Sequence, residues 1–490
     1  MANEFMRFTY DMKQTDKAEQ APGAILVDGS ESPETDLLPD DEFVSNYEPE
    51  KSSNALEYDL AVIGSGPAGQ TAAIKAARFG AKVIMFEKEM PGGRWLNTGC
   101  IPVKAYLKAN EGRAADLQKA LSNKNEIVSK MASNAARLLR ANRVRVEVGE
   151  AMLKSPHEIA CSGRVYRVSK IIICGGSDID RSYIPGLDHP GVWGTNDVFQ
   201  ASRVPQRLLI LGGGSKGCEL AAAFSAFGSN VMLVEQHHRL LPGWDAQIAE
   251  AVGKALAEAG VKVHTGITVN EIADRNGNPY LITGRGGVLC DKVVITAGRK
   301  PDTSFLGELA REFKMNKGAV AVNEYLETSL SGIYAAGDIT GLSSNANAAY
   351  YMAKIAAVNA TGGKRQLDLK SAPLTIQVSP EVASVGLTEE EAFEKLGDSL
   401  VTGYCPLLSN VKAMLTGKPE GFVKVLAGRK HGEIIGVHIV SPNASEMIAE
   451  PAALMRMEVT VNEIADEIIH AHPTYAEAFE EACVDALAKS

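Results

Sequence analysis

The chain has 490 residues, more than one hydrophobic core usually serves, and this length predicts about three domains. A formal net charge of −10 argues against nucleic acid and anionic membrane surfaces as partners, and no apolar run reaches the roughly 20 residues of a membrane span. The seven cysteines are scattered without CxxC spacing and without a secretory signal ahead of them. We therefore expect reduced thiols in a cytoplasmic protein, with no metal site.

Residues 1–56 are predicted to form an acidic extension that stands apart from the body of the chain. The stretch 28–57 is rich in Asp, Glu, Ser and Pro and poor in aromatic residues. That composition is typical of a disordered or loosely docked segment. A docking arm, or a flap that folds over the body, is the alternative.

A first glycine loop opens the body of the chain. Residues 58–63 have the apolar sequence of a buried strand, and the loop that follows carries Gly64, Gly66 and Gly69 before a helical segment. The next predicted strand ends at Glu87. Glycines at these places allow a tight turn, close approach of the backbone to a pyrophosphate, and contact between helix and strand. The unit therefore predicts a dinucleotide site.

The pattern recurs about 150 residues further on. Residues 207–211 form the predicted strand, Gly212, Gly214 and Gly217 lie in the loop, and the strand at 230–234 ends at Glu235. A carboxylate at this place accepts both ribose hydroxyls and repels a 2′-phosphate, which favours NAD over NADP. Two such units predict two bound dinucleotides.

Four polar residues near the second loop allow more than one interpretation. His237, His238 and Arg239 follow Glu235 directly and either soften the preference for NAD or form a solvated loop. Lys216 lies inside the loop, where it either meets the pyrophosphate or points to solvent.

Three further segments complete a recognisable order along the chain. They are residues 92–104, Gly-Gly-Arg-Trp-Leu-Asn-Thr-Gly-Cys-Ile-Pro-Val-Lys, residues 332–338, Gly-Ile-Tyr-Ala-Ala-Gly-Asp, and residues 470–477, His-Ala-His-Pro-Thr-Tyr-Ala-Glu. With the two glycine loops, these segments resemble the class I pyridine nucleotide-disulfide oxidoreductases, and within that class the dihydrolipoamide dehydrogenases. The resemblance extends from about Tyr58 to the C-terminus.

The resemblance implies that the first loop binds FAD. It assigns Glu87 to the adenosine ribose and Asp338 to the ribityl-phosphate region, with a helix-capping acid as the alternative for Asp338. Ala346 matches the position whose backbone meets the isoalloxazine, with Asn347 in place of the family's usual His. Gly93 belongs to the same implied cofactor set.

For the redox centre, the resemblance implies that Lys104 lies beside the flavin N5 and that Glu219 is its ion-pair partner. A paired carboxylate offsets the cost of burying such a cation. Independent surface charges are the alternative for this pair. The second loop is implied to bind NAD, with Gly298 in the same set.

The C-terminal segment is implied to supply acid–base groups across a dimer interface. His472 would be the base and Glu477 the acid that orients it, since a carboxylate fixes one imidazole tautomer and raises basicity. A histidine pair that caps an interface helix is the alternative. His470 is expected to be structural.

The implied fold is α/β, with two Rossmann-like dinucleotide-binding domains, for FAD and NAD, and an α+β C-terminal dimerisation domain. The predicted boundaries are 57–190 for the FAD-binding domain, 191–320 for the NAD-binding domain, 321–369 for an FAD-side central domain and 370–490 for the interface domain. A homodimer follows from the same resemblance.

The segment around Cys100 departs from the family pattern at one decisive place. Trp95 stands where the family has the first redox cysteine, so Cys100 lacks its intramolecular disulfide partner. Thiol–disulfide exchange needs a nucleophilic sulfur, which an indole does not supply, and the indole would fill part of a lipoyl channel. Turnover of dihydrolipoamide is therefore expected to be severely impaired.

Three functions remain open at this point. In the first, Cys100 cycles through a sulfenic acid or a mixed disulfide with a small thiol. In the second, Cys100 is a spectator and reduced flavin passes electrons directly to a quinone or similar acceptor. The third is a non-enzymatic FAD-binding dimer with the acidic arm as a docking element. The retained Lys104, Glu219, His472 and Glu477 argue against the third, and the retained pair of His472 and Glu477 favours the first over the second.

A weaker resemblance points toward small organosulfur substrates. The Gly-Gly-Ser-Lys loop, the acidic lead-in and residues 323–329 are partly similar to 2-ketopropyl-coenzyme M oxidoreductase/carboxylase, which cleaves a thioether within this fold.

Overall fold

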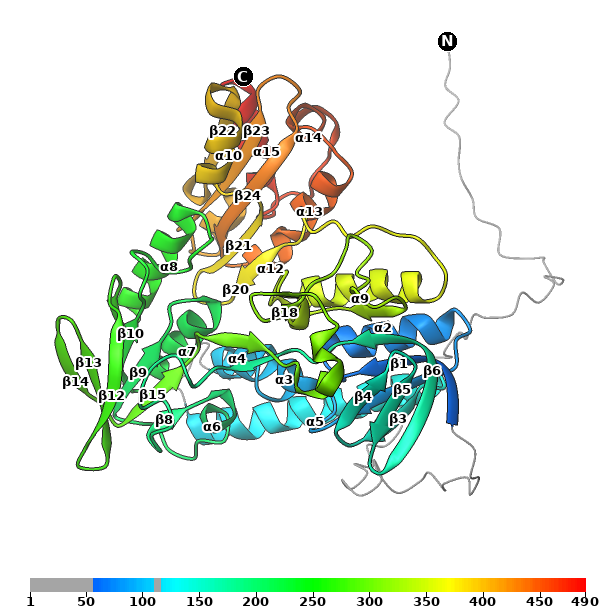
Figure 1. The fold of residues 1–490 in the computed structure, drawn as a ribbon. Helices are drawn as coiled ribbons and strands as arrows, with labels where there is room; N and C mark the ends of the chain where they lie inside the picture. Colours follow the sequence, from blue (N-terminus) through cyan, green and yellow to red (C-terminus); the bar gives the residue numbers. More distant parts are fainter. Residues whose placement is uncertain (1–55, 110–115) are drawn as a thin grey trace, which may run out of the picture. The chain divides into compact units, whose positions relative to one another are not determined.

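The computed structural model describes residues 56–109 and 116–490 (Figure 1). The predicted acidic extension lies outside the described residues, apart from Leu56, which begins the first strand. The remaining chain builds three larger sheets and several small ones. The predicted α/β class, with two Rossmann-like units followed by an α+β domain, is confirmed.

The first sheet has seven strands in the order β3-β2-β1-β6-β5-β4, with β19 beside β6. These strands are β1 (Leu56–Ile63), β2 (Val83–Glu87), β3 (Arg145–Val148), β4 (Ala151–Ser155), β5 (Glu158–Cys161), β6 (Arg164–Ile173) and β19 (Ile333–Ala335). β1, β2, β3, β6 and β19 run parallel, whereas β4, β5 and β6 are antiparallel neighbours. The unbroken apolar run of residues 60–63 is buried, as expected for a parallel strand covered on both faces.

Helices cover this sheet and carry the chain from its strands toward the site. They are α2 (Pro67–Arg78), α3 (Gly93–Asn97), α4 (Cys100–Ala109), α5 (Leu117–Ala141) and α9 (Ala346–Ala360). α2 and α9 pack closely on one another, and their small alanine side chains allow the approach (Figure 1).

The second sheet is fully parallel, in the order β11-β10-β9-β15-β8. Its strands are β8 (Val192–Trp193), β9 (Arg207–Leu211), β10 (Asn230–Val234), β11 (Lys262–His264) and β15 (Lys292–Ile295), with helices α6 (Thr195–Val198), α7 (Ser215–Ala226) and α8 (Ala246–Glu258). An antiparallel sheet of β12 (Val269–Arg275), β13 (Asn278–Thr283) and β14 (Gly286–Leu289) follows. The strands predicted at 207–211 and 230–234 coincide with β9 and β10.

The third sheet is antiparallel, in the order β20-β21-β24-β23-β22. Its strands are β20 (Leu374–Ile376), β21 (Glu381–Gly386), β22 (Leu400–Pro406), β23 (Phe422–Gly428) and β24 (Ile434–Ser441). Its helices are α10 (Glu389–Leu396), α11 (Val411–Leu415), α12 (Ala444–Met447), α13 (Ala449–Arg456), α14 (Val461–Glu467) and α15 (Glu477–Leu487), with 3-10 turns η3 (Gly397–Ser399) and η4 (Leu407–Ser409). α15 packs on β22 and β23, where its buried face joins their core.

Short elements connect the first and second sheets. β7 (Ser177–Ile179) pairs with β16 (Arg299–Pro301), and β17 (Met315–Asn316) with β18 (Ala319–Val320). The 3-10 segments η1 (Ser304–Arg311) and η2 (Asp338–Thr340) lie nearby in sequence. Because Phe305, Leu306 and Val320 pack in the core of the first sheet, we propose that the chain returns to this core just after Pro301, earlier than the predicted boundary at 320.

A buried charged cluster joins α8 of the second sheet to the third sheet. Lys424 on β23 contacts Asp245 at 2.7 Å and Glu389 at 2.9 Å, and the Lys424 and Asp245 side chains are 2% and 1% exposed. Burial opposes ionisation of Asp245, but the charge on Lys424 and the N–H of Glu389 help to hold its pKa below the usual value. Burial lowers the pKa of the neighbouring His438 to about 4, which keeps that ring neutral. Lys424 is therefore the cation that balances Asp245.

We expect Lys424→Met to destabilise the protein by about 3–5 kcal/mol, because the substitution leaves Asp245 buried without its cation. The midpoint of urea unfolding measures this loss, with Lys430→Met, an exposed site just beyond β23, as the matched control. The double variant Lys424→Met/Asp245→Leu should recover most of the loss. A single variant as stable as the control would show that the ion pair does not anchor this contact.

Candidate active site

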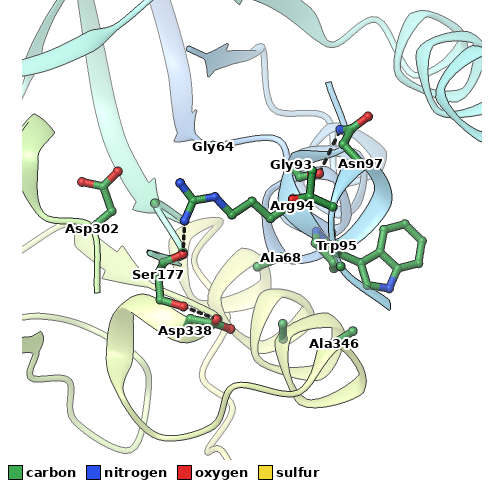
Figure 2. A pocket seen from close by; sticks show the side chains of 18 of the residues that line it. Gly64, Ala68, Gly93, Arg94, Trp95, Asn97, Ser177, Asp302, Asp338 and Ala346 are labelled. Atoms are coloured by element: carbon green, nitrogen blue, oxygen red, sulfur yellow. Dashed lines mark hydrogen bonds between the residues drawn. The ribbon is translucent and has the colours of Figure 1, made fainter. Parts of the chain in front are cut away.

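A cavity of about 520 Å³ is lined by residues from the first and second sheets. Its wall includes the first glycine loop, α3, the start of α4, the N-terminus of α7 and the segment that begins η2; Figure 2 shows part of it. Eleven of the predicted site residues line it: Gly64, Gly66, Glu87, Gly93, Cys100, Lys104, Gly214, Gly217, Glu219, Asp338 and Ala346. Gly69, Gly212, Glu235, Gly298, His472 and Glu477 are outside this lining.

Gly66 and Gly214 leave open space beside the main chain, into which a ligand can fit. Each residue is the N-cap of its helix, α2 or α7, and neither cap has a side-chain hydrogen bond. Both have ordinary backbone angles (φ −64° and −74°), and a Cβ added to either would meet no protein atom within 4 Å. A side chain there would intrude only into the cavity. Uncapped helix N–H groups beside open space suit a pyrophosphate, so these residues fit a dinucleotide.

Other glycines in the predicted set serve the fold itself. A Cβ on Gly69 would lie 1.8 Å from the Gly64 carbonyl oxygen, and one on Gly217 would lie 1.9 Å from the Gly212 carbonyl oxygen. Gly298 has φ +67°, and a Cβ there would lie 2.2 Å from the Tyr183 ring. At these three positions there is no room for a side chain, so glycine is needed for the close packing of the loops.

The contrast between Gly66 and Gly69 gives a direct prediction. We expect Gly66→Ala to unfold at the wild-type temperature without FAD but to bind FAD about tenfold or more weakly, because its methyl group enters only the cavity. Gly69→Ala should instead lower the unfolding temperature through its clash with Gly64. Thermal scans of the apoprotein and an FAD titration measure both effects. Equal behaviour of the two variants would contradict this division of roles.

The two acids at the strand ends make the same contacts in both halves. Glu87 accepts hydrogen bonds from the Ser65 N–H at 2.8 Å and from the Glu89 N–H at 2.9 Å. Glu235 accepts from the Gly213 N–H at 2.6 Å and from the N–H two residues beyond it at 2.9 Å. Both carboxylates therefore brace their glycine loops, and their proposed ribose contacts remain predictions.

Residues 236–238, which follow Glu235, are exposed, and Arg239 is partly buried. The His237 ring contacts the Glu235 carboxylate at 2.5 Å, and Arg239 forms a two-pronged ion pair with Glu390 of α10 at 2.6 and 2.5 Å. His238 is exposed. The segment is therefore a solvated loop in which His237 and Arg239 each contact a carboxylate, and its effect on the preference for NAD stays a prediction.

The predicted lysine–glutamate pair is present. Lys104 Nζ lies 2.6 Å from Glu219 Oε1, joining α4 to α7. Glu219 also accepts a hydrogen bond from the Gln377 N–H at 3.0 Å, and its side chain is only 3% exposed. Residues 115 positions apart in sequence thus meet in the wall of the cavity, so independent surface charges are excluded for this pair.

Cys100 and Trp95 line the same cavity from adjacent helices. Cys100 is the first residue of α4 and is partly exposed, whereas the other six cysteines are buried. The Trp95 indole meets the Tyr350 ring edge-on, with centroids 6.0 Å apart. Burial raises the pKa of Tyr350, and negative charge on Cys100 adds to this effect, so Tyr350 remains a neutral phenol beside the thiol.

At the start of α9, Ala346 borders the cavity. Its neighbour Asn347, which replaces the family's usual His, donates a hydrogen bond from its side chain to the Pro373 carbonyl. This amide therefore links α9 to the chain just before β20.

Two arginines that the sequence analysis did not select converge on Ser177. Arg94 donates to the Ser177 carbonyl at 2.6 Å and pairs with Asp178 at 2.6 Å; Figure 2 shows it reaching toward Ser177 while the Trp95 indole extends the other way. Arg299 donates to the same carbonyl at 2.6 Å and lies 3.8 Å from Asp338. The sequence offered a reason to select both arginines, because Arg94 directly precedes Trp95 and Arg299 directly follows Gly298. Nothing in the sequence pointed to Ser177, whose hydroxyl donates to Asp338 at 2.5 Å.

Lys216 is partly exposed to solvent, and no carboxylate of the described residues lies within ion-pair distance of its amine. It lines the cavity near the N-terminus of α7, and among residues 56–109 and 116–490 it has no hydrogen bond or ion pair. Burial lowers the pKa of this amine to about 8, and the charge of Arg299 acts in the same direction. Negative charge on Cys100, Asp338 and Glu219 opposes that shift.

The predicted C-terminal dyad is formed within one chain. His472 Nδ1 lies 2.7 Å from Glu477 Oε1, and the Thr474 N–H donates to the other carboxylate oxygen at 2.7 Å. Partial burial opposes ionisation of Glu477, but these two hydrogen bonds hold its pKa below the usual value. The His472 side chain is 65% exposed and is not part of the cavity lining of its own chain. His470, by contrast, lies buried between Glu450 and Glu480 at 2.9 and 2.8 Å.

The paired glycine loops, the lysine–glutamate pair and a thiol in one wall define a dinucleotide-dependent oxidoreductase. The pyridine nucleotide-disulphide oxidoreductase family matches residues 58–353, and that family's dimerisation domain matches residues 372–483. This chain belongs to the pyridine nucleotide-disulphide oxidoreductase family.

Individual relatives agree with this assignment. The dihydrolipoyl dehydrogenase of Thermus scotoductus is 36% identical over 450 residues, 87% of this chain and 96% of that protein. A mercuric reductase of Staphylococcus aureus is 33% identical over 434 residues, 84% of this chain and 79% of that protein. The structure of the HOCl-induced flavoprotein disulfide reductase RclA from Escherichia coli superposes with a TM-score of 0.80 at 27% identity, covering 88% of this chain and 99% of that one.

The protein is therefore an NAD-linked flavoprotein oxidoreductase of the dihydrolipoyl dehydrogenase type, with FAD and NAD(H) as cofactors. The predicted recognition and cofactors are confirmed. The dimerisation domain supports a homodimer. No helix in the described parts of the chain is both long and apolar enough to cross a bilayer.

Proposed function

We propose that this protein uses NADH to reduce a small disulfide, with Cys100 as the single exchanging sulfur. The observation that carries the proposal is the place of Cys100. It is the only described cysteine that is not buried, it begins a helix, and it lines the cavity that holds Lys104 and Lys216. A helix N-terminus and nearby cations stabilise a thiolate, which is the nucleophilic form of cysteine.

The proposed exchange balances with one NADH for each disulfide. The Cys100 thiolate attacks one sulfur of the substrate, a new S–S bond forms at Cys100, and the first substrate thiolate leaves. When bound, FAD accepts the hydride of NADH and passes the electron pair on to sulfur. That pair breaks the bond at Cys100, which releases the second thiol and restores the Cys100 thiolate. One proton from solution completes the two substrate thiols.

We further propose that the His472–Glu477 pair supplies this proton. Because His472 is exposed and does not line the cavity of its own chain, the pair would serve the other subunit's cavity in a homodimer. The contact with Glu477 holds a proton on Nδ1 of His472. Nε2 is then free to exchange a proton with the leaving thiolate of the substrate.

Mass spectrometry of the Cys100 peptide tests the proposed function. Incubation of the FAD-loaded protein with bis(2-hydroxyethyl) disulfide should place one mercaptoethanol adduct on Cys100, and anaerobic NADH should remove it with release of one thiol. The buried cysteines of the same digest serve as internal controls. An unmodified Cys100, or an adduct that NADH leaves in place, would refute the proposed function.

One observation favours a second candidate, direct transfer from the flavin to a quinone. Trp95 lines the cavity and packs edge-on against Tyr350, which gives a planar acceptor an aromatic surface. In that case Cys100 would be a spectator, and its replacement by serine would leave turnover with the preferred acceptor intact.

A further inference from the structure

The segment that carries His472 has no regular secondary structure. Residues 468–476 lie between α14 and α15 and form neither helix nor strand. Side-chain contacts must therefore hold His472 in place. The Asn410 side chain, at the start of α11, donates a hydrogen bond to the Thr474 carbonyl at 3.0 Å and so holds the chain after His472. Another contact is needed to hold the chain before it.

His470 makes that contact through two carboxylates. Its side chain is 5% exposed, and its Nε2 lies 2.9 Å from Glu450 of α13. Its Nδ1 lies 2.8 Å from Glu480 of α15, in an ion pair that lacks the alignment of a hydrogen bond. The two contacts are favourable at the same time only when both ring nitrogens carry protons, so the ring acts as a cation between two acids.

Two acids on the first turn of α15 match the two histidines. Glu477 and Glu480 are three residues apart, so they lie on the same face of this helix. Glu480 contacts His470, and Glu477 Oε1 lies 2.7 Å from His472 Nδ1. One turn of one helix therefore holds both histidines, and the contact at His470 fixes where the chain reaches Glu477.

We propose that His470, through Glu480, is a positioning residue that aligns His472 with Glu477. The inference rests on the proton transfer proposed above for the pair of His472 and Glu477. Because His470 is buried between its two acids, it acts only through His472. Loss of its contact should slow the step that needs a proton, the release of substrate thiol. The reduction of FAD by NADH should keep its wild-type rate.

A double-mutant cycle on the FAD-loaded homodimer tests this inference. With NADH and bis(2-hydroxyethyl) disulfide at pH 7, we expect Glu480→Ala to lower kcat about tenfold and to leave the KM for NADH within about twofold of wild type. In the His472→Gln background, the same change should lower kcat by less than about twofold, because the imidazole that it displaces is already absent. Glu481→Ala, at the exposed next position of α15, is the matched control and should have no effect.

Light scattering at the assay concentration checks that each variant keeps the mass of the wild type. His470→Gln repeats the cycle should Glu480→Ala fail to fold or to form the dimer. An equal loss of kcat in both backgrounds, or no loss in the wild-type background, would overturn the inference. Failure of the proposed proton transfer appears differently, as wild-type kcat in His472→Gln alone.

Discussion

Cys100→Ser should lower NADH-dependent reduction of small disulfides by at least about 1,000-fold. A hydroxyl at this place cannot form the mixed disulfide on which the proposed exchange depends. NADH should still reduce the bound flavin at close to the wild-type rate, because the lysine–glutamate pair and both glycine loops are unchanged. Stopped-flow absorbance of the flavin and steady-state consumption of NADH separate the two steps.

The matched control for this variant is Cys290→Ser. Cys290 is buried next to β14, away from the cavity, and its thiol contacts the Pro279 carbonyl, a contact that serine can keep. The control should retain disulfide turnover. Retained turnover in Cys100→Ser itself, at rates similar to the control, would instead support direct electron transfer from the flavin.

Trp95→Cys should raise lipoamide reduction by at least about 100-fold over the wild type, which we expect to be nearly inactive. The introduced thiol would stand five residues before Cys100, the family spacing, and would restore a nucleophile on the substrate side. The other residues that we propose to take part keep their contacts, with Lys104 paired to Glu219 and His472 paired to Glu477. An NADH-oxidation assay with lipoamide measures the gain.

Trp95→Ala distinguishes two explanations for low activity with lipoamide, which are the missing thiol and the bulk of the indole. It opens the cavity beside Tyr350 as much as Trp95→Cys does but adds no sulfur. It should therefore stay inactive with lipoamide. If it gained as much activity as Trp95→Cys, steric blockage rather than the lost nucleophile would explain the wild type. Lipoamide turnover by the wild type at rates similar to its other substrates would contradict the account of Trp95.

Local patterns predicted the fold well because each carried several mutually consistent signals. The strand, glycine loop and acid of the second unit located β9, α7 and Glu235, and the structure adds why Gly69 and Gly217 must be glycines: a Cβ at either would strike a backbone carbonyl. The pair of Lys104 and Glu219 was inferred only through the family resemblance, because the two residues are far apart in the chain.

The sequence did not predict which polar and charged groups surround the cations in the cavity wall. Arg299 and Ser177 meet only because β16 pairs with β7, an antiparallel contact between segments about 120 residues apart. The environment of Lys216 likewise depends on α4, α7 and η2 meeting in one wall. The carboxylate partners of His237 and Arg239, which are Glu235 and Glu390, were not predicted because side-chain direction and the packing of α10 set them.

An anaerobic NADH titration tests the central claim, that Cys100 is a redox centre, most directly. The FAD-loaded protein is first treated with bis(2-hydroxyethyl) disulfide, freed of excess reagent, and titrated while flavin absorbance and released thiol are recorded. A flavin alone takes one two-electron equivalent. We predict that about two equivalents of NADH are needed, with one thiol released for each subunit. Full reduction at about one equivalent, without thiol release, would contradict the claim and leave Cys100 a spectator.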